Sequence, residues 1–314
     1  MDEIGEGRRL WTRFKKNFGL TAIALPGLIW FILFSYLPLI GIVIAFKDYR
    51  ISGGFFESLL SSEWVGFENF KFMFATNDAK IMVRNTLLYN VFFIVINIAV
   101  PLFIAIMISE LLNKQGAKAY QTMIFFPYFL SWVVVSYFVW AFLSPDRGLI
   151  NRLLESLGMD GVSWYSEKKY WPFFLTFFNT WKNLGYNIVI YLATIVGIDR
   201  TYYEAASLDG ASKWQQVKHI TLPQLRSLVA VLFLMAIGKV FNSDFGLFYQ
   251  VPRNSGALFP VTQTVDTYVY RTFRVIGDIG MSSAAAAFQS IVGLVFILVA
   301  NYVIRKIDRE SALF

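Results

Sequence analysis

The sequence predicts an all-α, polytopic membrane protein with six transmembrane helices. Of its 314 residues, 56% are hydrophobic and 16% are charged, whereas soluble domains carry about a quarter charged residues. Charges are also absent from four long stretches, residues 17–46, 85–109, 119–145 and 279–304. Each stretch exceeds the roughly 20 apolar residues that a helix needs to cross the hydrocarbon core of a bilayer. Lipid is therefore expected to be the main solvent of this chain.

Charges well inside two of the predicted helices set them apart from the other four. The six helices are expected at residues 20–46, 84–112, 119–143, 172–197, 224–250 and 279–304. The fourth contains Lys182, and the fifth contains Lys239 and Asp244. An ionisable side chain at membrane depth is costly and normally faces the interior of a bundle or a water-filled cavity. The fourth and fifth helices are therefore predicted to line a pathway through the protein.

Basic residues flank the predicted helices in a way that indicates their orientation. Five lie between Arg8 and Lys16, directly before the first helix, and three follow the sixth. Cytoplasmic loops are enriched in Lys and Arg, so both termini are predicted to be cytoplasmic. The net charge of +7 is then a consequence of topology and does not indicate nucleic-acid binding. The predicted domains are a cytoplasmic or interfacial segment, 1–18, the six-helix domain, 19–307, and a cytoplasmic tail, 308–314.

Several kinds of chemistry are excluded by the residues that the sequence lacks. It has no cysteine, a single histidine, His219, and no GxxxxGK[ST] phosphate-binding loop. A nucleophile–base pair, a metal cluster and an ATPase domain are therefore not expected, and the chain is predicted not to be an enzyme. An ion-coupled secondary transporter would need inverted repeats and carboxylates within its spans. Asp244 is the one carboxylate predicted at membrane depth, which makes this alternative weak.

The segment between the fourth and fifth helices, residues 199–223, is predicted to contain two short helices of its own. Thr201 and Glu204 fit a capping box, T-x-x-E, and Ser212 and Gln215 fit a second one, S-x-x-Q. A loop of this length that has its own secondary structure is usually functional.

Two further residues of this segment are expected to shape the chain. Gly210 suits the left-handed conformation that follows the end of a helix. Pro223 is expected to interrupt the second short helix before the fifth membrane helix begins.

Seven positions of the segment match the pattern EAA-x3-G-x9-I-x-L-P. They are Glu204, Ala205, Ala206, Gly210, Ile220, Leu222 and Pro223. This pattern is the signature of the membrane subunits of binding-protein-dependent ABC importers, a family that the chain resembles from about Gly19 to Ile307. In that family the loop forms the coupling helix, which lies on the cytoplasmic side and docks in a cleft of a separate ATPase.

The resemblance implies roles for individual residues of the loop. The implied ATPase-coupling residues are Glu204, Ala205, Ala206, Leu208, Asp209, Gly210 and Ala211. Glu204 would make polar contacts in the cleft, the two alanines would allow a close approach, and Gly210 would form the turn. ATP and Mg²⁺ would be used by the partner ATPase, and no cofactor would be bound by this chain.

Three further stretches narrow the resemblance. They are VGFENFKFMF at 65–74, VDTYVYR at 265–271 and AAAFQSIVGL at 285–294. These stretches are similar to those of maltose-type carbohydrate permeases, in particular the group that imports complex polysaccharides and is described as lipoprotein-associated. A permease for another small solute could share the loop motif and stays an alternative.

The resemblance also implies a location and a set of partners. The chain would lie in the bacterial cytoplasmic (inner) membrane together with a second, homologous permease subunit and a dimer of cytoplasmic ATPase subunits. An extracytoplasmic solute-binding protein would deliver the oligosaccharide and would meet the outer segments 47–83, 144–171 and 251–278.

Candidate pathway residues follow from the way proteins bind sugars, through aromatic faces and hydrogen-bonding side chains. Residues 179, 182, 183 and 186 share one face of the fourth helix because of their spacing. The candidates are Asn179, Lys182, Asn183, Tyr186, Lys239, Asn242, Asp244, Tyr249 and Gln289.

The two lysines leave three readings open. Lys182 and Lys239 could face the cavity and favour an acidic sugar, such as a uronate-containing oligosaccharide. Either lysine could instead pair with Asp244 and neutralise charge between helices. Either could also lie near a face of the membrane and extend its ammonium group to water.

Overall fold

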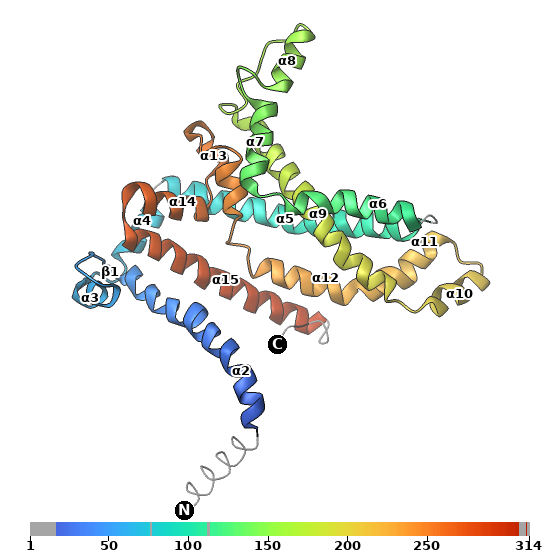
Figure 1. Cartoon of the computed structure of the whole chain (residues 1–314), viewed down its shortest axis with the longest axis horizontal. Coiled ribbons are helices and arrows are strands. Elements are labelled where there is room, and N and C mark those ends of the chain that lie inside the picture. The colour runs from blue at the N-terminus through green and yellow to red at the C-terminus, as the bar shows by residue number, and fades with distance from the viewer. Residues whose placement is uncertain (1–16, 76, 112–113, 308–311, 313–314) are drawn as a thin grey trace, which may run out of the picture.

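Long helices that run side by side form most of the protein (Figure 1). The computed structural model describes residues 17–75, 77–111, 114–307 and 312. The basic segment predicted to anchor the N-terminus, and all of the predicted tail except Ala312, lie outside the described residues. The fold is therefore all-α, as predicted, apart from one short hairpin in which β1 (Lys47–Asp48) pairs antiparallel with β2 (Glu63–Trp64).

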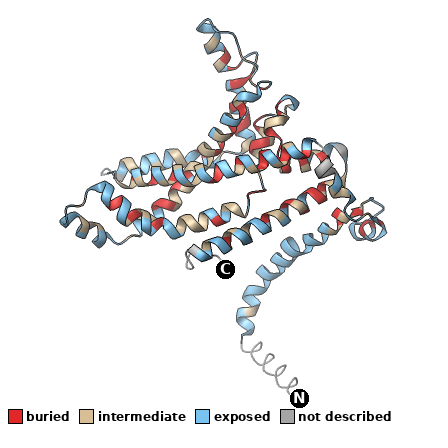
Figure 2. Cartoon of the chain, turned by 180° about the vertical axis from the view of Figure 1, so that it is seen from behind, coloured by how far each residue is buried: buried red, intermediate tan, exposed pale blue. Residues whose placement is uncertain are grey.

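The first membrane-length helix stands apart from the others. It runs from α2 (Phe18–Phe31) through η1 (Ile32–Tyr36) and η2 (Leu37–Phe46), which confirms the helix predicted at 20–46. No residue of α2 is buried, although every residue except Thr21 is apolar or glycine. In Figure 2 nearly all of this helix has the colour of exposed residues. Only the end of η2 packs on the rest of the chain, where Ile44 and Ala45 are buried.

Three long helices and one shorter helix, α12, make up the body of the bundle. They are α5 (Asn77–Ser109), α9 (Trp171–Val196), α12 (Leu222–Ile237) and α15 (Ile279–Ile307). α5 packs along α9, and α12 packs against α15. The structure thus confirms helices close to the predicted ranges 84–112, 172–197 and 279–304.

Shorter elements connect these helices. They are α3 (Phe55–Ser61), α4 (Glu68–Ala75), α6 (Lys114–Phe125), η3 (Phe126–Phe129), α7 (Trp132–Leu143), α8 (Leu149–Ser156), η4 (Lys168–Tyr170), α10 (Arg200–Leu208), α11 (Lys213–Gln216), η5 (Val217–Thr221), η6 (Gly246–Gln250), η7 (Gly256–Leu258), α13 (Phe259–Thr262), α14 (Val265–Arg271) and η8 (Thr272–Ile276). Figure 1 shows α8 at the tip of an arm and α10 at the opposite end of α9.

Among the described residues, four helical stretches are long and apolar enough to cross a membrane. They are Phe18–Phe46, Asn77–Ser109, Lys213–Ile237 and Ile279–Lys306, and the bent pair Gln115–Phe129 with Trp132–Leu143 would make a fifth. α9 has 26 residues, so at 1.5 Å per residue its length of about 39 Å is sufficient to cross. Its polar residues keep it out of this apolar set. The count of six spans therefore stays a prediction.

The helix predicted at 119–143 is wrong as a continuous element. It is interrupted at Leu130–Ser131, where its two halves meet at an angle of 98°. Pro127 lies just before the break and cannot donate a backbone hydrogen bond. The second half begins at a cap, because the Ser131 hydroxyl accepts a hydrogen bond from the amide of Val134 at 3.3 Å.

The helix predicted at 224–250 is also wrong in its second half. α12 ends at Ile237, the chain turns through residues 238–245, and the π-helical η6 follows. Side chains such as Asn242, Ser243 and Asp244 compete with helical hydrogen bonds by binding nearby backbone groups. At the start of α12 the opposite error occurs, because Pro223 does not separate the two helices. One helix runs from Lys213 to Ile237, and the wider π-helical turn η5 precedes the proline.

Two apolar clusters hold the body of the bundle together. One joins α5, α7, α9 and η6 through buried residues that include Phe93, Val135 and Trp171. The other joins α5, α9 and α12 and includes Ala105 and Ile188. Along both α5 and α9, a stretch with fewer buried apolar residues lies between these clusters. The polar pocket described below starts beside the first cluster, of which Phe93 is a part, and extends along that stretch.

Candidate functional site

The loop predicted to couple to an ATPase folds as two capped helices, α10 and α11. Asp199 caps α10, because its carboxylate accepts a hydrogen bond from the amide of Thr201 at 3.0 Å. This backbone hydrogen bond lowers the pKa of Asp199 below its ordinary value. The predicted capping box of Thr201 and Glu204 is therefore wrong, since α10 begins at Arg200 and Thr201 already lies inside it.

The second predicted cap of the loop is confirmed. The Ser212 hydroxyl accepts from the amide of Gln215 at 3.4 Å, and the Ser212 amide donates to the Gln215 side chain at 2.7 Å. Gly210 has a φ of +78°, which confirms the left-handed turn expected between the two helices. This conformation is strained for any residue that has a Cβ atom.

Hydrogen bonds and one ion pair attach the loop to the bundle. The Gln216 side chain donates to the Ser207 hydroxyl at 2.8 Å. Lys213 forms an ion pair with Glu110, at the end of α5, with an N–O distance of 3.3 Å. These contacts tie the two loop helices to each other and to α5.

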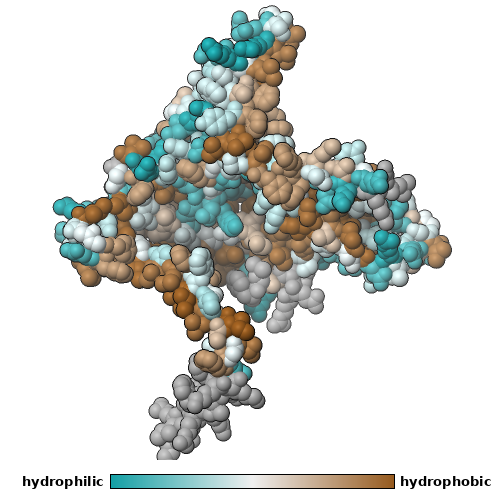
Figure 3. All heavy atoms as spheres, in the orientation of Figure 1, coloured by the Kyte–Doolittle hydropathy of each residue, from teal (hydrophilic) through white to brown (hydrophobic). Residues whose placement is uncertain are grey.

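The outer face of the loop is exposed, including apolar side chains. Of the seven predicted coupling residues, Ala206 and Ala211 are half-buried and the other five are exposed. Leu208 is 89% exposed and Trp214 is 69% exposed, so the described part of the chain leaves most of both side chains uncovered. Figure 3 shows hydrophilic residues mixed with brown hydrophobic ones at this end of the molecule. The arrangement is that of a surface ready to contact another protein.

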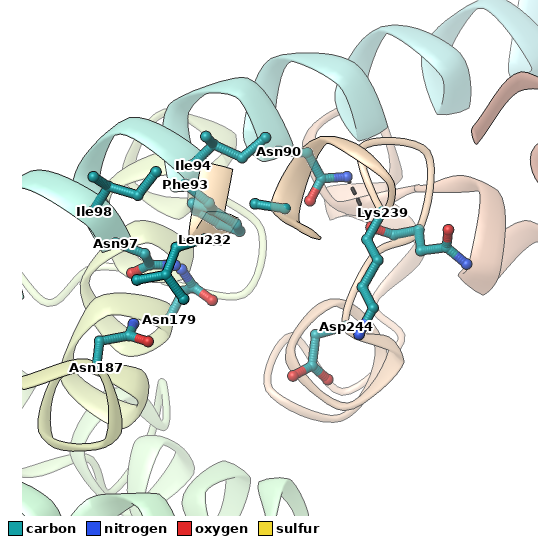
Figure 4. Close-up of a pocket in the computed structure, with 12 residues that line it drawn as sticks. Asn90, Phe93, Ile94, Asn97, Ile98, Asn179, Asn187, Leu232, Lys239 and Asp244 are labelled. Carbon is teal, nitrogen blue, oxygen red and sulfur yellow. Dashed lines mark hydrogen bonds between the residues drawn. The ribbon is translucent and has the colours of Figure 1, made fainter. Parts of the chain in front are cut away.

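A polar pocket of about 240 Å³ lies between α5, α9 and α12. Its lining residues are Asn90, Phe93, Ile94, Asn97, Ile98, Asn179, Asn187, Leu232, Ala236, Lys239, Asn242 and Asp244. Figure 4 shows Asn97, Asn179 and Asn187 gathered on one side of the pocket, and Lys239 and Asp244 on the other. The amides therefore face a space that opens between apolar helices.

The pocket lies near the middle of the longest helix. α5 has 33 residues and a length of about 50 Å at 1.5 Å per residue. Asn90 and Asn97 lie about 20 and 30 Å from its first residue by the same measure. Polar sites near the middle of a bilayer are typical of transport proteins.

Two buried amide atoms of the pocket have no hydrogen-bond partner within the described chain. They are Oδ1 of Asn97, an acceptor, and Nδ2 of Asn179, a donor. A buried polar atom that stays unpaired costs about 1–3 kcal/mol. A hydroxyl group can both donate and accept, so a polyhydroxylated ligand or water suits this pair of atoms.

The structure brings four of the nine predicted pathway residues together in the pocket. They are Asn179, Lys239, Asn242 and Asp244. Asn183 binds the backbone and side chain of Asn179 at 2.9 and 3.2 Å. Tyr186 stacks on Tyr128 with ring centroids 4.9 Å apart.

The sequence argument missed three asparagines of the pocket, Asn90, Asn97 and Asn187. The spacing of seven residues between Asn90 and Asn97 places both on one face of α5, inside an otherwise apolar run. That spacing was the available signal. Of the remaining predicted residues, Tyr249 lies outside the pocket and stacks on Phe245 at 4.7 Å between centroids.

Lys182 does not line the polar pocket. Its ammonium group donates to the backbone carbonyls of Tyr128 and Leu130, at 2.8 and 2.6 Å. These carbonyls lie at the break between α6 and α7. Among the described residues, neither Lys182 nor Lys239 forms an ion pair with Asp244 within 4 Å. The predicted pairing of a lysine with Asp244 is therefore not found at that distance.

The second break, residues 238–245, is held by side chains from other helices. The Asn90 amide donates to the carbonyls of Val240 and Asn242, at 2.8 and 2.9 Å. Irregular backbone at membrane depth is tolerated only where it lines a cavity or is buried in protein, because each polar group needs a partner. Asn90 supplies two of these partners and also lines the pocket.

Gln289 and Asp266 hold the rest of this segment. The Gln289 amide donates to the Phe241 carbonyl at 2.7 Å. Asp266, in α14, accepts from the Ser243 amide at 2.6 Å and from the Ser243 hydroxyl at 2.8 Å. Gln289, predicted as a pathway residue, thus lies outside the pocket and binds the backbone that shapes it. The motif VDTYVYR contributes Asp266 to the same task.

The described fold and its two surfaces define a class of protein. Apolar helices of membrane length surround a polar pocket at mid-depth, and an exposed helix pair at one end is available to another protein. This is the architecture of a membrane-embedded transport subunit. Residues 73–309 match the family of binding-protein-dependent transport system inner membrane components, and the chain belongs to that family.

Two similar proteins match nearly the whole chain. Protein LplB of Bacillus subtilis (strain 168) is 34% identical over 307 residues, which are 98% of this chain and 95% of that protein. The polygalacturonan/rhamnogalacturonan transport system permease protein YteP of the same organism is 33% identical over 304 residues, 97% of this chain and 93% of that one.

Two solved structures are also similar to nearly the whole chain. A subunit of a bacterial ABC transporter involved in the import of the acidic polysaccharide alginate superposes with a TM-score of 0.86 and 31% identity, covering 96% of this chain and 99% of that one. A second structure shows the alginate transporter in complex with an alginate pentasaccharide-bound periplasmic protein, with a TM-score of 0.85. The predicted resemblance to sugar and polysaccharide ABC permeases is confirmed. The family is one of transport components and not of enzymes.

Proposed function

We propose that this chain is the transmembrane subunit of a binding-protein-dependent ABC importer that takes up oligosaccharides. It forms half of the translocation pathway, and a second, homologous permease subunit forms the other half. It also transmits the action of a separate cytoplasmic ATPase dimer, which uses ATP and Mg²⁺, to the pathway. With six spans, both termini would lie on the same side of the bacterial inner membrane, and we assign them and the coupling helix α10 to the cytoplasmic side.

The exposed loop 199–223 carries this proposal. It carries Glu204, Ala205 and Ala206 of the motif on the capped helix α10, whose Leu208 is 89% exposed. Short capped helices are stiff, so a displacement of the loop is passed to the helices on either side. Three residues separate the end of α9 from the start of α10, and α11 continues through η5 into α12 as one helix. A push on the loop would therefore move α9 and α12, two of the three helices that line the pocket.

The pocket supports a polyhydroxylated cargo. Its polar atoms are mostly amides, which bind hydroxyl groups by donating and accepting. Among the similar proteins, the permease YteP and the alginate transporter are named for polysaccharide cargoes, whereas less similar permeases are named for sn-glycerol-3-phosphate and for osmoprotective compounds. Among the described residues that line the pocket, Lys239 is the one cation, and Asp244 lines the same pocket. The acidic-sugar hypothesis therefore rests on Lys239 and the similar proteins, since Lys182 is occupied by backbone carbonyls.

The test uses the complete complex in liposomes with its binding protein and a panel of neutral and uronate oligosaccharides. ATP hydrolysis and uptake are measured for the wild type, Glu204→Ala and Gly210→Asp. We expect sugar-loaded binding protein to stimulate hydrolysis by the wild type and not by the two variants. The sugar that stimulates identifies the cargo. Normal hydrolysis and uptake by both variants would show that this loop is not the coupling element.

Gly277→Asp is the control for backbone strain. Gly277 has the same φ of +78° as Gly210 and likewise no atom within 4 Å of a Cβ built on it. It lies outside the loop, so Gly277→Asp shares the strain without touching the proposed coupling surface. The yield of assembled complex should be similar for Gly210→Asp and Gly277→Asp.

A further inference from the structure

We infer that Trp132 is a positioning residue that ties the two broken helices together, and that this tie is needed to couple ATP hydrolysis to transport. The inference rests on the proposed function of the loop 199–223. Trp132 is the first residue of α7, directly after the break between α6 and α7. Its side chain reaches the other break, at residues 238–245, through Asp244.

The tie is formed by direct contacts. The Trp132 indole N–H donates to Oδ2 of Asp244 at 2.6 Å. Oδ1 of the same carboxylate accepts from the amide of Leu247 at 3.3 Å, at the start of η6. A hydrogen bond to a carboxylate is stronger than one between neutral groups. Both oxygens of Asp244 are therefore held, and its carboxylate has a fixed place at the pocket.

Close packing reinforces the tie. A Cβ atom added to Gly246 would lie 2.2 Å from an atom of the Trp132 ring, so only glycine lets the ring lie this close to η6. On its other side, the ring centroid is 5.4 Å from the ammonium nitrogen of Lys182. An ammonium group at this distance from an indole ring is attracted by the ring's π electrons. Trp132 thus contacts one residue on α9 and two residues that follow α12.

The two flanks of the coupling loop meet at this tryptophan. α9 leads into the loop and carries Lys182, which holds the α6–α7 break through two carbonyls. α12 leads out of the loop and ends just before the segment that carries Asp244. A displacement of the loop therefore reaches the bent α6–α7 pair by both routes. When the tie is intact, α9 and the segment after α12 move as one unit.

The test removes the indole hydrogen bond and measures the number of sugars imported per ATP hydrolysed. In Trp132→Phe, the ring is kept in part but the N–H donor is lost. The matched control is Trp181→Phe, because the indole of Trp181, the neighbour of Lys182, makes no hydrogen bond within the described chain. We expect the ratio to fall about tenfold in Trp132→Phe and to stay unchanged in Trp181→Phe.

Two further variants separate coupling from folding. Asp244→Asn keeps an acceptor for the indole and should lower the ratio less than Asp244→Ala. In the double variant Trp132→Phe/Asp244→Ala, the ratio should be no lower than in Asp244→Ala alone, since both changes remove the same Trp132–Asp244 hydrogen bond. A proportional fall of hydrolysis and uptake in Trp132→Phe, with the ratio unchanged, would overturn the inference and leave a merely structural role.

The two proposals fail in different ways. If Glu204→Ala and Gly210→Asp lose stimulated hydrolysis while Trp132→Phe keeps the wild-type ratio, the loop couples and the tie does not. If the loop variants behave as the wild type and Trp132→Phe still lowers the ratio, the tie acts from another coupling element, and the proposed role of the loop is wrong.

Discussion

The coupling loop and the two intramembrane breaks are both places where helices end, and they end for different reasons. In the loop, the groups that satisfy the helix ends come from residues two or three positions away, as in Asp199 with Thr201 and Ser212 with Gln215. At the breaks, the partners come from distant parts of the chain. Lys182 lies 52 residues from Leu130, and Asn90 lies 150 residues from Val240.

This difference follows from the solvent around each region. The loop is exposed, so a local cap is sufficient and water completes the rest. The breaks lie within a bundle of membrane-length helices, where no water is available to donate a hydrogen bond to an unpaired carbonyl. Lysine and asparagine side chains from other helices take the place of water there. The two regions therefore respond differently to mutation.

Lys182→Met should have the largest effect, because it leaves the carbonyls of Tyr128 and Leu130 without a donor. We expect a loss of about 3 kcal/mol in the free energy of unfolding, measured in mixed detergent micelles. Lys182→Arg, which keeps several donors, should recover most of it. A Lys182→Met protein as stable as the wild type would mean that the break does not depend on this bond.

Gln289→Leu should cost less, since it removes the donor to one carbonyl, that of Phe241, and a contact with Asp266. We expect a loss of about 2 kcal/mol in the same measurement. Ser290→Ala is the control, because the Ser290 hydroxyl bonds only within its own helix, to the Ala286 carbonyl. Equal losses for the two variants would show that the break is not held by Gln289.

Gly210→Ala should be milder, because it strains a single residue of the loop. A side chain in the left-handed conformation costs about 1 kcal/mol, so we expect faster amide exchange in α10 and α11 with the bundle unchanged. Gly197→Ala is the control: Gly197 has a φ of −76°, and an added Cβ would meet ordinary contacts at 3.4 Å. Exchange in the loop that is equally fast in both variants would argue against strain at Gly210.

Asp199→Ala should have the smallest effect, a local fraying of the first turn of α10. The hydrogen bond from Thr201 lowers the pKa of Asp199, so the charged cap is fully effective above the ordinary aspartate pKa. Its contribution is lost as the pH falls through the lowered value. Amide exchange at Thr201, compared with the intrinsic rate at each pH, should show protection lost at low pH in the wild type and absent throughout in Asp199→Ala. The same measurement on Thr201→Ala should show more protection than on Asp199→Ala, because the side chain of Asp199 forms the cap.

The sequence was sufficient to predict features that depend on neighbours. The helix at 279–304, the second cap of the loop and the turn at Gly210 follow from hydropathy and short-range patterns. The break at residues 130–131 could not be found this way, because the apolar run continues through it. At residues 238–245 the polar side chains were interpreted as the lining of a pathway and not as the sign of a break. What permits each break is a partner such as Lys182 or Asn90, whose position in space is set by the packing of whole helices.

The same limit applies to the candidate site. A charge inside an apolar run shows that a residue has a polar partner, without showing which kind of partner. Lys182 and Gln289 were read as facing the substrate and instead bind backbone carbonyls. Asn97, an uncharged residue in an apolar helix, was not predicted as a pathway residue, yet it lines the pocket and its buried Oδ1 is unpaired.

The exposed first helix has a consequence for the way this protein is made. Since α2 buries none of its residues, its own chain contributes almost nothing to holding it in place before η2. A helix of this kind can enter the bilayer as an independent unit, and helices inserted in this way associate in a later step. For α2 that later step needs a surface beyond the bundle of its own chain, so insertion of this segment and assembly of the complex are separate events in the life of the protein.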